Sequence, residues 1–110
     1  MEINEGKLPL WRQLQATATV VQAVRGGHSG TAAIETVAGP LRPGVQALAF
    51  HVWRNLGRAQ ALRKQLAPRS PPPAVDALLC TALALAWSDE GAPYDAFTLV
   101  NQTVEAAKRN

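Results

Sequence analysis

The sequence predicts an all-α fold. Its 110 residues are 47% hydrophobic and 17% charged, and alanine and leucine dominate over the β-branched and aromatic residues that favour strands. Glycine and proline recur at near-regular intervals, and the segments between them carry apolar residues at a helical spacing. We therefore expect about six helices in one domain over residues 9–110, preceded by a tail at residues 1–8.

The first two helices are expected over residues 9–25 and 29–38. Pro9 is tolerated in a first helical turn, and the glycine pair after the first helix is typical of a helix end. Ser29 is a favourable N-cap for the second helix, which a Gly-Pro pair should close. The residues expected to face the core are Leu10, Leu14, Ala18, Val21, Val24, Ile34 and Val37.

The clearest amphipathic pattern starts at Pro43 and gives a third helix. Gly57 should kink or stop it, and a fourth helix should continue to about Ala67 with Arg58, Arg63 and Lys64 exposed. The apolar stripe of the two helices contains Val45, Leu48, Ala49, Val52, Trp53, Leu56, Ala59, Leu62 and Leu66.

The last two helices are expected over residues 73–88 and from about Asp95 to Lys108, joined by a loop at residues 88–93. The first of them is apolar on nearly all sides and should lie in the middle of the bundle. Both Asp95 and Lys108 suit the helix dipole. The inner face of the last helix should consist of Phe97, Val100, Val104 and Ala107.

Positive charge gathers in the middle of the chain. Between Glu35 and Asp76 there are six arginines or lysines and no acid, so this segment carries +6 while the whole chain carries +3. Such a segment indicates either a face turned toward a polyanion or a solvated basic helix.

The residues that could perform catalysis lack the necessary neighbours. Cys80 lies in an apolar run, where we expect a buried thiol with a raised pKa. His28 and His51 have no cysteine or carboxylate at metal-ligand spacing, and the carboxylates are scattered over loops and helix starts. We therefore expect no enzyme activity, no metal and no cofactor in this chain.

The location suggested by the sequence is the cytoplasm. A single cysteine excludes an intramolecular disulfide and suits a reducing compartment. The longest uncharged apolar run, residues 77–87, has eleven residues, whereas a membrane span needs about 20. We expect no membrane partner.

Three stretches resemble a known family. They are Arg12 in an alanine-rich helix leading to residues 24–29, residues 49–54 ending in Arg54, and residues 94–108, which are the most specific. In these stretches the chain resembles the NusB-like domain at the N-terminus of the bacterial 16S ribosomal RNA cytosine-5 methyltransferases, the RsmB/Sun family. The resemblance covers nearly the whole chain.

The resemblance implies a NusB-like helical bundle that helps hold ribosomal RNA. A separate methyltransferase domain, absent here, would transfer the methyl group from S-adenosylmethionine and would be a partner of this one. The expected RNA-binding residues are Arg12, Arg25, Arg54, Arg58, Arg63 and Lys64. Arg12 follows from the resemblance alone, and a structural role is the alternative for Arg54.

An alternative function is a protein-interaction module of the antitermination or dimerisation type. The family has a further helix after the segment that ends at Asn110. Its absence should leave an apolar groove beside Phe97 and Val100, open to a partner helix or to self-association.

Overall fold

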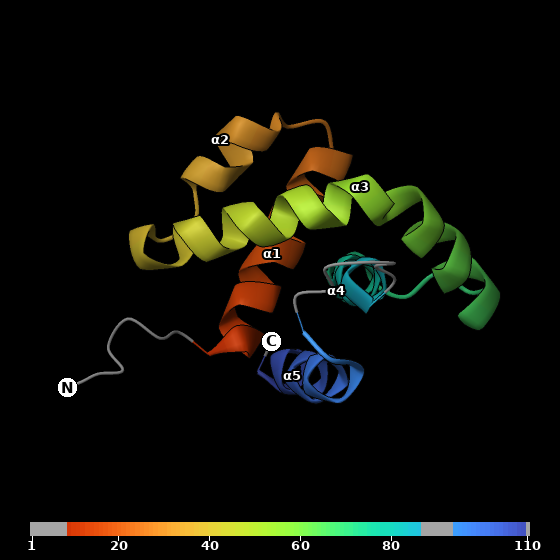
Figure 1. The fold of residues 1–110 in the computed structure, drawn as a ribbon. Coiled ribbons are helices and arrows are strands. Elements are labelled where there is room, and N and C mark those ends of the chain that lie inside the picture. The colour runs from red at the N-terminus through yellow and green to blue at the C-terminus, as the bar shows by residue number, and fades with distance from the viewer. Residues whose placement is uncertain (1–8, 87–93, 110) are drawn as a thin grey trace.

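The computed structural model describes residues 9–86 and 94–109. These residues form five α-helices and one short 3-10 helix and contain no strand, which confirms the all-α prediction. The helices are α1 (Leu10–Arg25), α2 (Gly30–Glu35), η1 (Gly39–Leu41), α3 (Arg42–Leu66), α4 (Pro73–Ala86) and α5 (Ala96–Lys108). Figure 1 shows α3 lying across one side of the bundle and α5 on the opposite side, with α4 between them.

The first half of the chain folds largely as predicted. Gly26 ends α1, and Gly27 follows with φ at +107°, a conformation that favours glycine. The Ser29 hydroxyl accepts a hydrogen bond from the Ala32 amide at 3.1 Å and caps α2. This helix ends at Glu35, earlier than expected, and the following Gly-Pro pair forms η1 rather than a simple stop.

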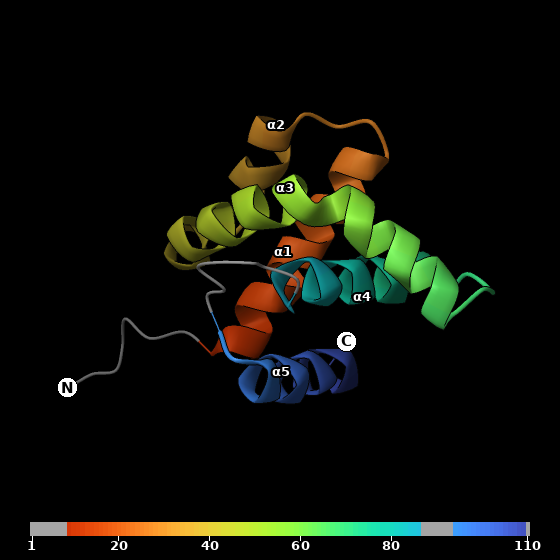
Figure 2. The same cartoon turned by 45° about the vertical axis from the view of Figure 1, so that its right-hand side comes forward.

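Helix α3 is continuous, so of the two outcomes expected at Gly57, a kink or a stop, the stop is wrong and the helix is not divided in two. It runs for 25 residues, and its ribbon changes direction in its second half (Figure 2). Gly57 is exposed and costs the helix only about 1 kcal/mol relative to alanine. Packing outweighs that cost, because Val52 and Ala59 on either side of Gly57 belong to one core cluster. The described part of the chain therefore has five α-helices rather than six.

The central position predicted for the fifth expected helix is confirmed. Helix α4 packs against α1, α3 and α5. Ala77, Cys80, Ala84 and Leu85 on it are fully buried. The predicted end of this helix at residue 88 and the loop over residues 88–93 lie outside the described residues.

The predicted inner face of α5 is wrong. Phe97, Val100 and Val104 are 79%, 63% and 53% exposed, whereas Leu99 and Ala106 are buried. Ala107, the fourth predicted inner residue, is exposed as well.

Two hydrogen bonds to α1 explain which face of α5 turns inward. The Trp11 amide donates to Gln102 Oε1 at 3.0 Å, and Gln15 Nε2 donates to the Ala106 carbonyl at 2.8 Å. The Trp11 amide is in the first turn of α1, where amides have no partner within the helix. The contact with α1 thus orients α5 by polar groups as well as by burial.

In residues 9–86 and 94–109, no helix combines the length and the apolar character needed to cross a bilayer.

Candidate nucleic-acid interface

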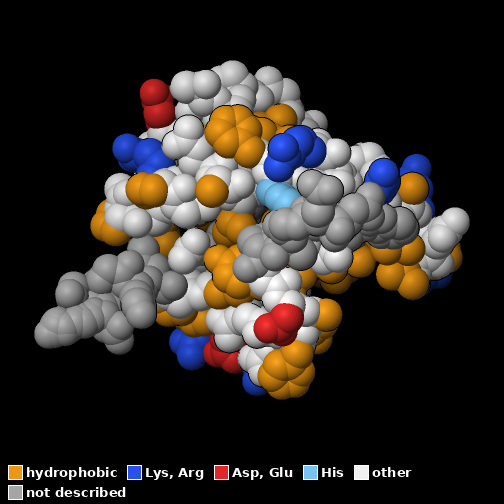
Figure 3. All heavy atoms as spheres, in the orientation of Figure 1, with side chains coloured by type: hydrophobic (Ala, Val, Ile, Leu, Met, Phe, Trp, Pro, Cys, Tyr) orange, Lys and Arg blue, Asp and Glu red, His pale blue; other side chains and the backbone are white. Residues whose placement is uncertain are grey.

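The basic surface follows the outer side of α3. Arg54, Arg58 and Lys64 are all exposed. At about 100° per residue, these three positions fall within about a third of the helix circumference. In Figure 3, lysine and arginine side chains are spread along the course of α3.

Among the described residues, no carboxylate pairs with the basic residues of this surface. Helix α3 contains five basic residues and no acidic one. In residues 9–86 and 94–109, none of Arg54, Arg58 and Lys64 forms an ion pair. On the face shown in Figure 3, the acidic side chains lie over α2 and α5 instead. Within the described part of the chain, the Arg54 and Arg58 guanidinium groups and the Lys64 ammonium group are therefore available to an external anion.

The structure contradicts the prediction that Arg63 is exposed. Arg63 is only 7% exposed. Its Nε lies 2.7 Å from Asp76 Oδ1, and its Nη1 donates to the Ala67 carbonyl at 2.8 Å. Arg63 holds the end of α3 against the start of α4 and is removed from the candidate RNA-binding surface.

Helical spacing could have identified Arg63 as an inward residue. It follows Val52, Leu56 and Ala59 at intervals of three and four residues, so it continues the apolar stripe of α3. Arg63 was predicted to be exposed because it is charged. Its position on the helix nevertheless places it inside, where Asp76 supplies the counter-charge.

Arg25 shares the same carboxylate but stays partly open to solvent. Its Nη2 donates to Asp76 Oδ2 at 3.0 Å, and its side chain is 32% exposed. Asp76 therefore joins α1, α3 and α4 at one point, which we call the Asp76 junction (Arg25, Arg63, Asp76). Asp76 lies in the first turn of α4, and no local signal in the sequence indicates its two distant partners.

A basic hollow lies beside this junction. It has a volume of about 470 Å³ and is lined by Arg25, Gln60, Arg63 and Lys64 together with small residues of α3 and Cys80. Lys64 thus belongs both to this hollow and to the exposed side of α3. The hollow extends the basic surface from α3 to the end of α1.

Arg12 stands apart from the α3 residues. It is exposed in the first turns of α1, at the end of that helix that lies beside α5 (Figure 1). Next to it, Trp11 stacks under the Arg109 guanidinium, with 4.6 Å between the guanidinium carbon and the ring centre. The six predicted site residues therefore do not form one cluster.

The candidate catalytic residues sit in structural positions. Cys80 is fully buried, and burial, with a smaller contribution from Asp76, raises the pKa of its thiol as predicted. His28 is exposed with Nδ1 3.1 Å from the Ala23 carbonyl, and His51 is half-buried. Within residues 9–86 and 94–109, no group of three or more His, Cys, Asp or Glu side chains could hold a metal ion.

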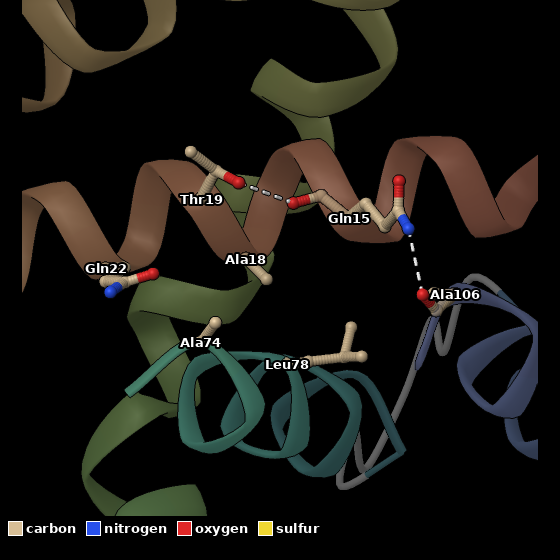
Figure 4. Close-up of a pocket in the computed structure, with 7 residues that line it drawn as sticks. All are labelled: Gln15, Ala18, Thr19, Gln22, Ala74, Leu78 and Ala106. Carbon is tan, nitrogen blue, oxygen red and sulfur yellow. Dashed lines mark hydrogen bonds between the residues drawn. The ribbon is translucent and has the colours of Figure 1, made fainter. Parts of the chain in front are cut away.

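A small hollow between α1, α4 and α5 has no ionisable lining. Its volume is about 110 Å³, and Gln15, Thr19 and Gln22 are its polar side chains. Figure 4 shows the Gln15 amide directed at the Ala106 carbonyl and the Thr19 hydroxyl directed back at its own helix. The Gln15–Ala106 hydrogen bond at this hollow links α1 to α5, and no ionisable side chain lines the hollow.

The three stretches that resemble NusB-like domains lie on different helices. The first spans the end of α1 and the cap of α2, the second lies in the middle of α3, and the third contains all of α5. Because the three stretches lie apart in the fold, they do not form a single site. No protein-family model, no curated protein and no solved structure matches the chain, so the NusB-like identity stays a prediction.

Proposed function

We propose that this chain is a non-catalytic RNA-binding domain of the NusB-like kind, which holds ribosomal RNA for a cytosine-5 methyltransferase. In that proposal the methyl group comes from S-adenosylmethionine bound to a different domain, and this chain supplies only RNA contacts. The observation that carries the proposal is the exposed set Arg54, Arg58 and Lys64 on α3, which has no carboxylate partner among the described residues.

Arginine is well suited to this role. Its planar guanidinium group binds phosphate oxygens in a bidentate manner and stacks on exposed bases. Arg54 and Arg58 are one helical turn apart, so one strand can contact both of them. Arg25 and Lys64 at the basic hollow would continue the contact toward α1.

The number of free cations limits the affinity. Each phosphate contact releases counterions, so binding should weaken steeply as salt rises. With few exposed aromatic side chains near α3, the domain would read little base sequence and would position RNA for the enzyme domain.

The test is binding to a labelled hairpin of small-subunit ribosomal RNA at two salt concentrations. The variants are Arg54→Gln, Arg58→Gln and Lys64→Gln, each compared with Lys108→Gln, which removes the same single charge from α5. We expect each α3 variant to weaken binding and to lower the dependence of log Kd on log salt by about one. The Lys108 variant should bind like the parent.

Arg12→Gln tests the residue that rests on the resemblance alone. A loss of binding in this variant would extend the interface to the start of α1. An absence of binding by the parent at low salt would reject the RNA proposal. Equal losses in the α3 variants and in the Lys108 variant would reject α3 as its location.

A protein-interaction role is the second candidate function. It is favoured by an apolar groove of about 300 Å³ between α4 and α5, whose lining is almost entirely apolar. Binding of RNA by α3 and binding of a protein at this groove use different surfaces and are therefore compatible.

A further inference from the structure

The outer side of α5 carries the most exposed apolar stripe among residues 9–86 and 94–109. Phe97, Val100 and Val104 are spaced by three and four residues, and Ala107 continues the stripe. Exposed apolar residues scattered singly are ordinary, but a continuous stripe at helical spacing is typical of a contact surface. In the sequence this stripe has the pattern of a core-facing side, yet α5 turns its other side to the core.

A groove runs directly beside the stripe. It is lined by Leu79, Leu83, Ala86, Ala96, Leu99 and Val100, together with Ala82, Thr103 and Val104. Val100 and Val104 belong to both features, so the stripe forms one lip of the groove. A protruding apolar side chain, Phe97, and an apolar hollow thus lie next to each other on one surface.

We propose that this surface binds a second copy of the chain through an antiparallel contact between the two α5 helices. A two-fold rotation pairs the same apolar surface on both copies, so the stripe and the lip of the groove of one copy cover those of the other. The rotation brings Phe97 of each copy to the C-terminal end of the partner's α5, while the Val100 and Val104 side chains that line the two grooves face each other. A two-fold contact of this kind closes on itself and gives a dimer.

Size and register favour the antiparallel arrangement. When the two-fold axis passes the middle of α5, Val100 lies opposite the partner's Val104. Phe97, the largest residue of the stripe, then lies opposite the partner's Ala107, the smallest. This alternation of large and small residues is the arrangement that lets facing helices interdigitate.

The charges at the two ends of α5 also favour the antiparallel arrangement. Asp95 stands at the N-terminal end of α5 and Lys108 at its C-terminal end, and both are exposed. In the antiparallel pair Asp95 approaches the partner's Lys108, and the two helix dipoles oppose each other. A parallel pair would place like charges together at both ends.

The contact should be weak. Helix α5 has 13 residues, which gives a length of about 20 Å. Such a contact lies at the small end of stable protein interfaces. We expect a dimer with a dissociation constant in the micromolar range.

Sedimentation velocity of the whole chain over a range of concentrations tests the proposal. Phe97→Ser should raise the dissociation constant about 100-fold, since a two-fold contact contains the substitution twice. The matched control is Leu66→Ser, which changes another strongly exposed apolar residue (69%) at the end of α3. It should leave the dissociation constant unchanged. Circular dichroism establishes that both variants keep the helical content of the parent.

Disulfide trapping tests the register. Val100→Cys together with Val104→Cys should give a cross-linked dimer, because disulfides need Cα atoms about 5.5 Å apart. Val100→Cys alone should not cross-link in the antiparallel register. The buried Cys80 thiol remains in all variants as an internal reference. Efficient cross-linking by the single variant would reject the antiparallel pair. A parent that stays monomeric at hundreds of micromolar, or an equal effect of Leu66→Ser, would reject the dimer.

Discussion

The Asp76 junction and the α4–α5 side of the molecule differ in which kind of side chain they bury and which kind they expose. At the junction, Arg63 and Asp76 are each only 7% exposed, and two arginines from different helices meet one carboxylate. On the α4–α5 side, Phe97 is 79% exposed beside an apolar groove. One region buries charge and the other exposes apolar surface.

The difference shows that the contacts available within the chain, and not residue type alone, decide which side chains are buried. Arg63 can be buried because the Asp76 carboxylate balances its charge and the Ala67 carbonyl accepts a hydrogen bond from its Nη1. Phe97 stays outside because Leu99 and Ala106 already fill the contact of α5 with α1 and α4. The junction is therefore complete within one chain, whereas the α4–α5 side offers its stripe to a partner.

The largest expected effect is at the junction. Asp76→Ala leaves the buried Arg63 guanidinium without its counter-charge and should lower the free energy of unfolding by about 3–5 kcal/mol. Urea unfolding followed by circular dichroism measures it. The matched control is Asp95→Ala, which removes an exposed carboxylate and should cost far less.

A double variant separates the ion pair from the packing around it. Asp76→Leu combined with Arg63→Met replaces both charges by apolar groups and should recover most of the stability lost in Asp76→Ala. A loss below about 1 kcal/mol in Asp76→Ala would mean that the junction does not hold the three helices together.

The next effect contrasts the core with the exposed stripe. Leu85 is fully buried in α4, so Leu85→Ala should cost about 3 kcal/mol through lost burial and the cavity it leaves. At concentrations where the chain is monomeric, Phe97→Ala should change stability by less than about 0.5 kcal/mol. Both values come from urea unfolding at low protein concentration. A large loss for Phe97→Ala in the monomer would show that the stripe packs within its own chain.

A smaller effect of the opposite sign is expected in α3. Gly57 lies inside this helix, and a Cβ added there meets open space. Gly57→Ala should therefore stabilise the chain by about 0.5–1 kcal/mol. Gly27→Ala is the contrasting variant and should destabilise, because φ is +107° at that position. Thermal unfolding compares the two, and a destabilised Gly57→Ala would contradict a continuous α3.

Local signals predicted most of the fold. Ser29 and Asp95 occupy N-caps, and Gly26 ends α1, because caps depend on a few neighbouring residues. Helix α4 could be placed centrally from its apolar composition alone. Gly57 was misjudged, because its cost to the helix is smaller than the gain from packing the residues on either side of it.

Distant contacts account for the rest. The side of α5 that faces inward depends on hydrogen bonds from Trp11 and Gln15, each of them 91 positions away in the chain. No pattern within α5 could reveal them. In the candidate site, helical spacing places Arg54 and Arg58 outside and Arg63 inside, while the ion pair between Arg63 and Asp76 joins two helices and has no local signal.

The smallest expected effect is the pH response at the start of α5. The Thr98 amide and hydroxyl donate to the Asp95 carboxylate at 2.8 and 3.2 Å, and these hydrogen bonds hold the pKa of Asp95 below its ordinary value of 3.8. A lowered pKa in the folded state means that the cap stabilises α5 above the unfolded pKa, and that this stabilisation is lost as pH falls through the folded pKa.

Amide hydrogen exchange at Thr98, compared between the parent and Asp95→Asn, measures the contribution of the cap. We expect protection in the parent to fall toward that of Asp95→Asn as the carboxylate is protonated. If Thr98 exchanges at the same rate in both proteins above that pH range, the capping carboxylate contributes nothing to the order of α5.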